Sequence, residues 1–227
     1  MSKIRDKLQT IGANINQFAD KYGRDSSHIQ LLAVSKRHSV DLIREAYQSG
    51  QHAFGENYAQ EMLDKAEDLA DLAIEWHFIG PLQSNKTKRI AETASWVHTI
   101  ERLKIAKRLN DQRPDKLPPL NICIQINSDE EASKSGIHIE DLSEFATEIS
   151  NLKNLCLRGL MAIPAPQTDF IKQRQAFSKV TKAYEELKQQ GFKLDTLSMG
   201  MSNDMEAAIA EGATIVRIGT AIFGKRD

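Results

Sequence analysis

Eight short apolar segments of strand-like composition alternate with amphipathic helical segments along the 227 residues, and this order predicts an α/β fold, a single (β/α)8 TIM barrel over residues 1–227. Strands separated by helices are typical of a parallel sheet. Because eight such units occur without an evident reversal of strand order, a closed barrel is favoured over an open doubly wound sheet, which is the alternative. The 41% of hydrophobic residues is enough for one sizeable core.

Each element is recognised by its apolar periodicity and by the residues at its ends. Apolar residues recur at helical spacing over 4–18, and we expect this extra N-terminal helix to cover the place of a final helix, because little chain follows the last strand. Ser39 and Thr99 are expected to cap the helices that follow them. The longest helix is expected over 169–190, ending at Gly191. The expected strands are 31–36, 53–55, 74–79, 96–99, 120–127, 155–163, 194–199 and 214–218.

Composition and charge exclude several classes of protein. The 30 Lys and Arg residues balance 31 Asp and Glu residues, so no global positive field is present to bind a nucleic acid. No apolar stretch is long enough to span a bilayer, and the charged N-terminus lacks the core of a signal peptide. Cys123 and Cys156 both fall in apolar strand-like segments and are expected to be reduced core residues. We therefore expect a cytoplasmic protein with neither a nucleic-acid nor a membrane partner.

Lys36 is the candidate reactive residue. It ends the first expected strand, and in a barrel the carboxyl ends of the strands form the catalytic face. A lysine that is partly desolvated there can become a neutral amine and form a Schiff base with a carbonyl group. The alternative is a lysine that only extends its ammonium group into water.

The last two expected strands lead into a pattern that favours a phosphate ligand. After the seventh strand, 200–203 opens a helix whose free N–H groups attract an anion, and Ser202 adds a hydroxyl group. After the eighth strand, Gly219 permits close approach of the backbone and Thr220 supplies a hydroxyl donor. The loops after strands seven and eight often bind phosphate in barrels.

Arg217 lies two residues before Gly219, so both side chains face the same side of the strand. From there Arg217 could reach the far side of a planar ring whose phosphate is held next to it; an ion pair with a barrel carboxylate is the alternative. A Schiff-base lysine and a phosphate site on one face predict either pyridoxal 5′-phosphate or a class I aldolase acting on a sugar phosphate.

Six segments, in the same order and over nearly the whole chain, resemble the pyridoxal phosphate homeostasis protein family. They are LAVSK (32–36), FGENY (54–58), WHFIGPLQSNK (76–86), RGLM (158–161), LSMGMSND (197–204) and VRIGTAIFG (216–224). The segments 76–86 and 197–204 are the most specific of them.

The resemblance implies a barrel like the N-terminal domain of bacterial alanine racemase, with pyridoxal phosphate bound as an aldimine on Lys36. It implies that Arg217 is the partner of the pyridine nitrogen and that Asn57 and His77 are neighbours of the ring. The phosphate-binding group that it implies consists of Ser198, Ser202, Gly219 and Thr220. It further implies a cytoplasmic, usually monomeric protein in vitamin B6 and amino/keto-acid balance, without an established reaction.

The residues also bear on whether such a site is catalytic. Arginine is a permanent donor, so a pyridine nitrogen that accepts from Arg217 stays largely unprotonated and the ring is a weak electron sink. Racemisation needs acid–base groups on both faces of the substrate carbon. The resemblance implies that the racemase takes the second group from another domain, whereas only three residues follow Gly224. Tyr58 is the tyrosine nearest to a strand end, and packing is its expected role.

These considerations predict a non-catalytic pyridoxal phosphate-binding protein that stores, delivers or senses the cofactor. Apo forms of pyridoxal phosphate-dependent enzymes are its expected recipients. Lys86, Lys88 and Lys225 are additional amines that could take part in transfer. The alternative is a weak amino-acid racemase or another pyridoxal phosphate-dependent enzyme, and a sugar-phosphate aldolase is a third hypothesis.

Overall fold

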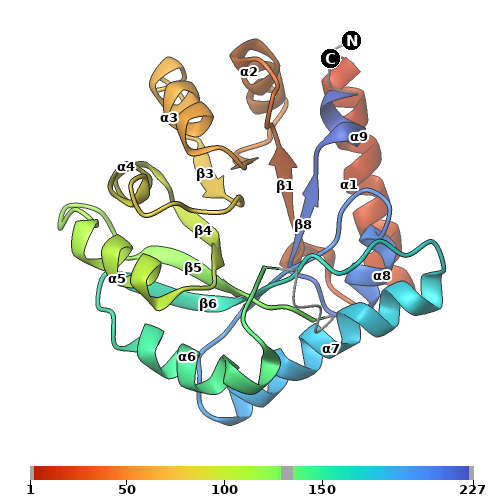
Figure 1. Cartoon of the computed structure of the whole chain (residues 1–227). Helices are drawn as coiled ribbons and strands as arrows, with labels where there is room; N and C mark the ends of the chain where they lie inside the picture. Colours follow the sequence, from red (N-terminus) through yellow and green to blue (C-terminus); the bar gives the residue numbers. More distant parts are fainter. Residues whose placement is uncertain (1–2, 129–134, 225–227) are drawn as a thin grey trace.

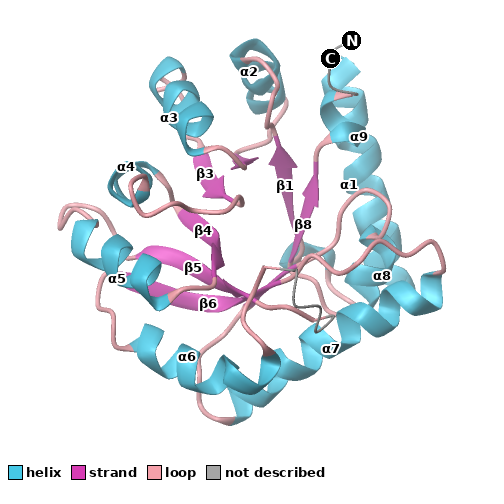
Figure 2. Ribbon diagram, viewed as in Figure 1, coloured by secondary structure: helices cyan, strands magenta, loops and turns pink. Residues whose placement is uncertain are grey.

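The computed structural model describes residues 3–128 and 135–224, and it confirms the predicted barrel. Each strand pairs in parallel with the next, and β8 pairs with β1 to close the ring. Figure 2 shows the strands inside a surrounding set of helices. The strands are β1 (Gln30–Val34), β2 (Ala53–Glu56), β3 (Glu75–Phe78), β4 (Trp96–Ile100), β5 (Leu120–Gln125), β6 (Leu155–Met161), β7 (Thr196–Ser198) and β8 (Ile215–Ile218).

The helices follow the strands in the expected alternation. Two short 3-10 helices, Ser26–His28 and Ile139–Asp141, supplement them. In the described residues, no helix combines the length and the apolar character that crossing a membrane requires. The α-helices are α1 (Lys3–Lys21), α2 (Val40–Gln48), α3 (Ala59–Asp68), α4 (Thr87–Thr93), α5 (Leu103–Gln112), α6 (Leu142–Ser150), α7 (Phe170–Gln189), α8 (Met205–Ala210) and α9 (Thr220–Phe223).

The N-terminal helix fills the place that a long final helix would take, as predicted. α1 lies beside α2, α8 and α9, so it completes the outer ring between the last and the first barrel units (Figure 1). Its apolar face is buried at Ile4, Ile11 and Ile15. Arg24, just after α1, donates from Nη1 to the carbonyl oxygens of Ile209 and Ala213, at 2.9 and 2.6 Å. These bonds tie the start of the chain to the segment that leads into β8.

The barrel interior has an apolar part and a polar part. Alternation along the strands turns Leu32, Val34 and Ile215 inward, away from the larger core between strands and helices. Trp96, Cys123 and Met161 form a second buried cluster. Polar side chains fill the remaining buried positions on the same strand faces, namely His77, His98, Ser198 and Arg217.

Three local predictions are wrong. Thr99 caps no helix: it lies within β4 and donates to the Gly80 carbonyl at 2.6 Å, because α5 begins only at Leu103. Cys156 is exposed, since it lies on the outer face of β6 beside the loop that contains Pro118 rather than beneath a helix. β1 ends at Val34, so Lys36 lies in the following loop and not in the strand.

Ser39 occupies the N-cap position of α2 as predicted, but its hydroxyl group makes no capping hydrogen bond. The apolar segment therefore predicts where this helix begins, whereas the expected capping interaction does not contribute to its stability.

Gly80 allows the loop after β3 to approach the loop after β2. A Cβ atom added at Gly80 would lie 1.9 Å from the Asn57 carbonyl oxygen. We expect Gly80→Ala to lower the free energy of unfolding by about 1–3 kcal/mol, because the backbone of one loop must move. Urea denaturation measures this change.

The matched control is Gly12→Ala in α1, where an added Cβ meets no atom within 4 Å. There the change should raise the free energy of unfolding by about 0.5–1 kcal/mol, because alanine favours a helix over glycine. Equal effects of the two substitutions would contradict the close approach.

Candidate functional site

The candidate residues gather where neighbouring strands end. Lys36 follows β1, which lies between β2 and β8 in the barrel. The loop after β1 contacts the end of β8, because a Cβ atom at Gly219 would lie 3.1 Å from the Val34 carbonyl oxygen. The His38 ring also stacks on Phe223 of α9, with ring centroids 5.1 Å apart. Lys36 therefore lies beside the segment that begins with Gly219 and Thr220.

A buried polar network holds the residue before Lys36. Ser35 is fully buried and donates from Oγ to Glu56 Oε1 at 2.6 Å. Lys65 Nζ donates to the Ser35 carbonyl at 2.8 Å and to Glu56 Oε1 at 2.7 Å. Burial raises the pKa of Glu56, and the ammonium group of Lys65 opposes that rise. The backbone and the side chain of Ser35 are thus both fixed from α3 and β2.

The same network holds the residue after Lys36. Glu61 Oε1 accepts from Lys65 Nζ at 2.7 Å and from the Arg37 backbone N–H at 2.5 Å. Arg37 has a φ of 61°, which L-residues adopt rarely, and it is the one non-glycine residue with positive φ in ranges 3–128 and 135–224. Because both neighbours of Lys36 are anchored, its Cα position is fixed more firmly than that of an ordinary surface loop.

Asn57 follows β2 and presents a polar atom without a protein partner. Its Oδ1 is buried and makes no hydrogen bond with the described residues. Buried polar atoms are almost always satisfied, so an orphaned oxygen at the strand ends fits a bound ligand that would satisfy it. The close approach of Gly80 to the Asn57 backbone helps to fix this position.

Arg217 is a buried cation inside the barrel, with 4% of its surface exposed. Nη1 donates to the carbonyl and to Oγ of Ser198, at 2.5 and 2.9 Å, and Nη2 donates to the Ala162 carbonyl at 3.0 Å. Burial lowers the pKa of Arg217 to about 10, and the Asp204 carboxylate opposes this effect. Arg217 makes no ion pair with a carboxylate of the described residues, so the alternative reading of its role is wrong.

Ser198 and His77 lie inside the barrel rather than at the accessible ends of the strands. Both are fully buried. Ser198 Oγ lies between Arg217 Nη1 and His98 Nδ1, the latter at 2.8 Å. His77 Nδ1 lies 2.9 Å from His98 Nε2, and its ring stacks on Trp96 with an interplanar angle of 6°. The structure therefore places Ser198 next to Arg217 and joins His77 to it only through His98 and Ser198.

The two loops that the sequence predicts to bind phosphate lie after adjacent strands. Ser202 is exposed in the loop after β7, and the Asp204 carboxylate in that loop accepts from the Met201 backbone N–H. Arg217 N donates to the Gly200 carbonyl at 3.0 Å, which joins this loop to β8. Gly219 and Thr220 stand at the start of α9. The arrangement leaves the Ser202 hydroxyl accessible on one side of β8 and Lys36 on the other.

Sequence reasoning missed the side chains that position the candidates. Glu61 and Lys65 stand four residues apart in α3, a spacing that favours an ion pair and could have indicated the network around Ser35. His98 lies two residues after Trp96 in β4, so both side chains share the inner face, and this spacing could have indicated that His98 lies inside the barrel. No sequence signal joins His98 to Ser198, because they are 100 residues apart.

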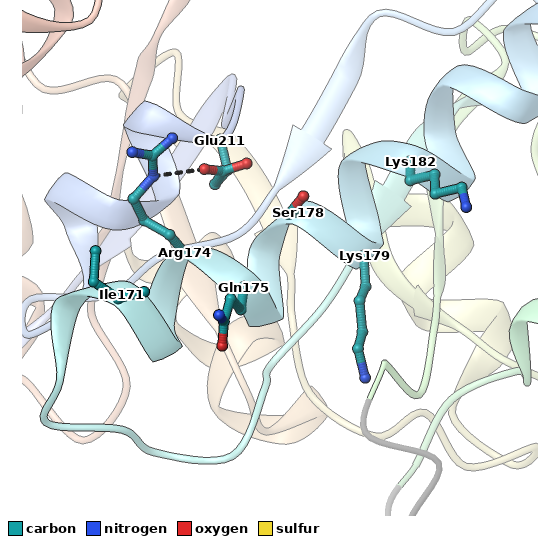
Figure 3. Close-up of a pocket in the computed structure, with 7 residues that line it drawn as sticks. All are labelled: Ile171, Arg174, Gln175, Ser178, Lys179, Lys182 and Glu211. Atoms are coloured by element: carbon teal, nitrogen blue, oxygen red, sulfur yellow. Dashed lines mark hydrogen bonds and ion pairs between the residues drawn. The ribbon is translucent and has the colours of Figure 1, made fainter.

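A groove on the outside of the barrel is unrelated to these residues. It has a volume of about 390 Å³ and runs along α7, where Ile171, Lys179 and Lys182 line it. Figure 3 shows that Arg174 and Glu211 face each other there, and their Nε and Oε1 atoms are 2.6 Å apart. None of the lining residues follows the carboxyl end of a strand, so we place the candidate site at the strand ends.

The fold and the strand-end residues define a barrel of the kind found in alanine racemase. The family model described as alanine racemase, N-terminal domain, matches residues 7–227. A solved alanine racemase from Clostridium difficile 630 has a TM-score of 0.79 with 14% identity, covering 99% of this chain and 57% of that chain. At this identity the likeness shows the fold alone.

Two nearer relatives are more specific. The chain is 53% identical over 227 residues to the pyridoxal phosphate homeostasis protein of Pseudomonas aeruginosa, covering 100% of this chain and 97% of the relative. It is 34% identical to PipY of Synechococcus elongatus PCC7942, solved with PLP bound, with a TM-score of 0.85 and coverage of 97% and 100%. The chain belongs to the pyridoxal phosphate homeostasis protein family, as its motifs indicated.

The network around Lys36 should be costly to break. We expect Lys65→Met to lower the free energy of unfolding by about 3–5 kcal/mol, because it leaves the buried Glu56 carboxylate without its cation. Adding Glu56→Gln should recover part of this loss, since the uncompensated charge is then removed. Urea denaturation of the three proteins measures both effects.

The control for that substitution is Lys21→Met, which removes an exposed ion pair to Glu206 at the same kind of distance, 2.8 Å. Its effect should be far smaller, because solvent screens exposed pairs. If Lys21→Met and Lys65→Met cost the same, the network does not anchor the loop through its buried charges.

Two buried histidines should make stability depend on pH. Burial lowers the pKa of His98 well below its ordinary value of 6.5, with smaller effects of His77 and Arg217, and burial also lowers the pKa of His77. The unfolded chain therefore binds protons below pH 6.5 that the folded chain does not. The free energy of unfolding should fall as the pH drops below 6.5, by up to about 1.4 kcal/mol per pH unit for each histidine.

Urea denaturation at several pH values between about 6.5 and 5.5 measures this slope. In His98→Asn the slope should be shallower than in the wild type by up to about 1.4 kcal/mol per pH unit. Identical slopes would show that His98 takes up its proton as readily in the folded as in the unfolded chain.

Proposed function

We propose that this protein binds pyridoxal 5′-phosphate as a carrier without a reaction of its own, and serves vitamin B6 and amino/keto-acid homeostasis. The observation that carries the proposal is the meeting of an anchored Lys36 loop with Gly219 and Thr220, next to the buried Arg217. The name of the relative that is 53% identical, and the PLP bound in PipY, support it.

Each candidate residue has a proposed role toward the cofactor. The cofactor supplies an aldehyde, to which the Lys36 amine would bind covalently as a Schiff base. Ser202, Gly219 and Thr220 would hold the phosphate with hydroxyl and backbone N–H donors. The orphaned Oδ1 of Asn57 would accept a hydrogen bond at the ring.

Arg217 would face the pyridine nitrogen. Its two Nη atoms are bonded to β7 and to Ala162, whereas Nε makes no hydrogen bond with the described residues. Ser198 and His77, which we expected in the phosphate group and beside the ring, would act through Arg217. A donor that cannot lose its proton keeps the ring nitrogen unprotonated, so the ring withdraws electrons weakly. This is the physical reason to propose a carrier.

A weak amino-acid racemase is the second candidate. Tyr58 was expected to pack, but 49% of it is exposed, and its hydroxyl lies 3.4 Å from Arg37 Nη2 in the loop that holds Lys36. A phenol that contacts the side chain of the residue after Lys36 is the observation that favours a second acid–base group. Prolonged incubation with a single enantiomer of an amino acid, followed by chiral analysis, decides between the two candidates.

The proposal also includes the location, the oligomeric state and the partners of the protein. We propose a cytoplasmic monomer, a single pyridoxal phosphate-binding domain over residues 1–227, that passes the cofactor to apo-enzymes. Lys88 has 71% of its side chain exposed, and Lys86 is the N-cap residue of α4, so both could accept the cofactor during transfer. Lys225 lies outside the described residues.

Lys36→Ala should abolish the visible absorbance band that appears when pyridoxal 5′-phosphate is added to the wild type, because Lys65, the other amine beside this loop, is engaged by Ser35, Glu56 and Glu61. Borohydride should fix a pyridoxyl-phosphate mass on Lys36 of the wild type, which intact-mass and peptide analysis detect. Lys88→Ala serves as the control and should keep the band.

A band of full strength in Lys36→Ala would show that the cofactor binds elsewhere. Absence of any band in the wild type, even with excess cofactor, would refute the proposed function. A sugar-phosphate aldolase, the third hypothesis, would show no such band and would instead trap its substrate with borohydride.

A further inference from the structure

A buried chain of polar side chains runs through the barrel from Arg217 to the opposite end of the strands. Arg217 Nη1 and Ser198 Oγ are 2.9 Å apart, and Ser198 Oγ and His98 Nδ1 are 2.8 Å apart. His98 Nε2 and His77 Nδ1 follow at 2.9 Å. The chain ends where His77 Nε2 lies 3.6 Å from Oε1 of Glu75, the first residue of β3.

The members of this chain come from both sides of the barrel. Arg217 and Ser198 stand on β8 and β7, whereas His98 and His77 stand on β4 and β3. Arg217 is 4% exposed and the next three are fully buried, so water does not compete for their hydrogen bonds. The Glu75 side chain, 39% exposed, brings the chain to the surface.

Only one arrangement of protons satisfies the inner links. Arginine has no acceptor, so Ser198 Oγ must accept from Arg217. Ser198 Oγ has no third partner among the described residues, so its proton goes to His98 Nδ1. A neutral His98 then carries its proton on Nε2 and donates it to His77 Nδ1.

The end of the chain agrees with this direction. His77 must then carry its own proton on Nε2, the nitrogen nearest to the Glu75 carboxylate; at 3.6 Å the two atoms make no hydrogen bond, and the carboxylate acts on this end through its charge. His77, with Trp96 and Gln30, lowers the pKa of Glu75 to about 2 despite partial burial, so this end is a stable negative charge. Every proton therefore points from the arginine toward the carboxylate.

We propose that His98 and His77 are positioning residues of the cofactor site, which keep Ser198 Oγ an acceptor for Arg217 and so fix the plane of its guanidinium group. The inference rests on the proposed function, because it takes Arg217 as the residue that faces the cofactor ring. Without His98 as acceptor, the Ser198 hydroxyl proton would have no buried partner, and the freed hydroxyl could rotate so that no lone pair is held toward Arg217.

A space-filling role for the histidines is the competing explanation. His77 stacks on Trp96 with ring centroids 5.4 Å apart, and an apolar ring could do the same. The two explanations differ in where the protons lie, which packing alone does not determine, and in what happens when shape is kept and the acceptor is removed.

The first measurement is the tautomer of each histidine, by long-range 1H–15N correlation on 15N-labelled wild-type protein at neutral pH. We expect both His77 and His98 to be neutral with the proton on Nε2. A proton on Nδ1 of His98 would overturn the proposal, since Ser198 could then not donate to it. This measurement does not depend on cofactor binding.

The second measurement compares His98→Asn with His98→Leu in the full chain, titrated with pyridoxal 5′-phosphate. The two side chains have nearly the same shape, but only the asparagine Oδ1 can accept from Ser198 where His98 Nδ1 did. We expect His98→Leu to weaken cofactor binding about tenfold and to shift the visible band, the effect of losing a hydrogen bond at a charged group. His98→Asn should bind close to wild type.

Equal weakening in both variants would overturn the proposal, because a cavity of the same size would then explain the effect. Thermal unfolding of both variants checks that they fold. If His98→Leu does not fold, the tautomers of the wild type and the binding by His98→Asn still decide. If the wild type shows the expected tautomers but binds no cofactor, the proposed function fails, and the positioning role fails with it.

Discussion

A permanent positive charge buried inside the barrel is the constraint on which the rest of the site depends. Arg217 is nearly inaccessible, and no carboxylate of the described residues pairs with it directly. A charge in such a place is costly unless its donors are satisfied. Two carbonyl groups and the Ser198 hydroxyl accept from its two Nη atoms, so the ends of β6 and β7 must lie close to β8. The register of the last three strands therefore determines the position of the guanidinium group, and a change in one would require a change in the other.

The residues on either side of Lys36 are held by a different kind of interaction. There the buried Lys65 carries a charge and two carboxylates surround it, so charge balance is local. Inside the barrel burial lowers the pKa of both histidines, and the charge of Glu75 lies at the far end. The loop that carries Lys36 thus depends on an ionic cluster, whereas the arginine depends on directional hydrogen bonds. The two sets share no residue, so one can be altered while the other stays intact.

Much of the fold followed from the sequence because it rests on local pattern. The apolar segments of 120–127 and 155–163 have the length and composition of strands, and eight such units favour closure. The ends of the elements were predicted less accurately, because the apolar pattern does not show where the hydrogen bonds between strands end. β1, for example, stops before Lys36. Thr99 is polar before a helix, and only the position of the Gly80 carbonyl shows why it stays in β4.

The candidate site was predictable in its backbone and less so in its side chains. Lys36, Gly219 and Thr220 could be brought together from the strand order alone. The partners of Ser198 could not, because His98 stands 100 residues away on the other side of the barrel. The sequence motif does not show which side chains the Ser198 hydroxyl will contact. In the closed barrel these are the Arg217 guanidinium group and the His98 imidazole ring.

The position of α1 has a consequence for synthesis of the chain. Lys21 pairs with Glu206, and Arg24 with Ile209, so each contact spans 185 residues. The first helix and the first strand leave the ribosome long before their neighbours α8 and β8 exist. Apart from what α2 covers, the apolar face of α1, with Ile4, Ile11 and Ile15, must therefore stay exposed or be sheltered by a chaperone until synthesis is nearly complete. α1 and β1 are synthesised first, but they reach their final contacts only when the barrel closes.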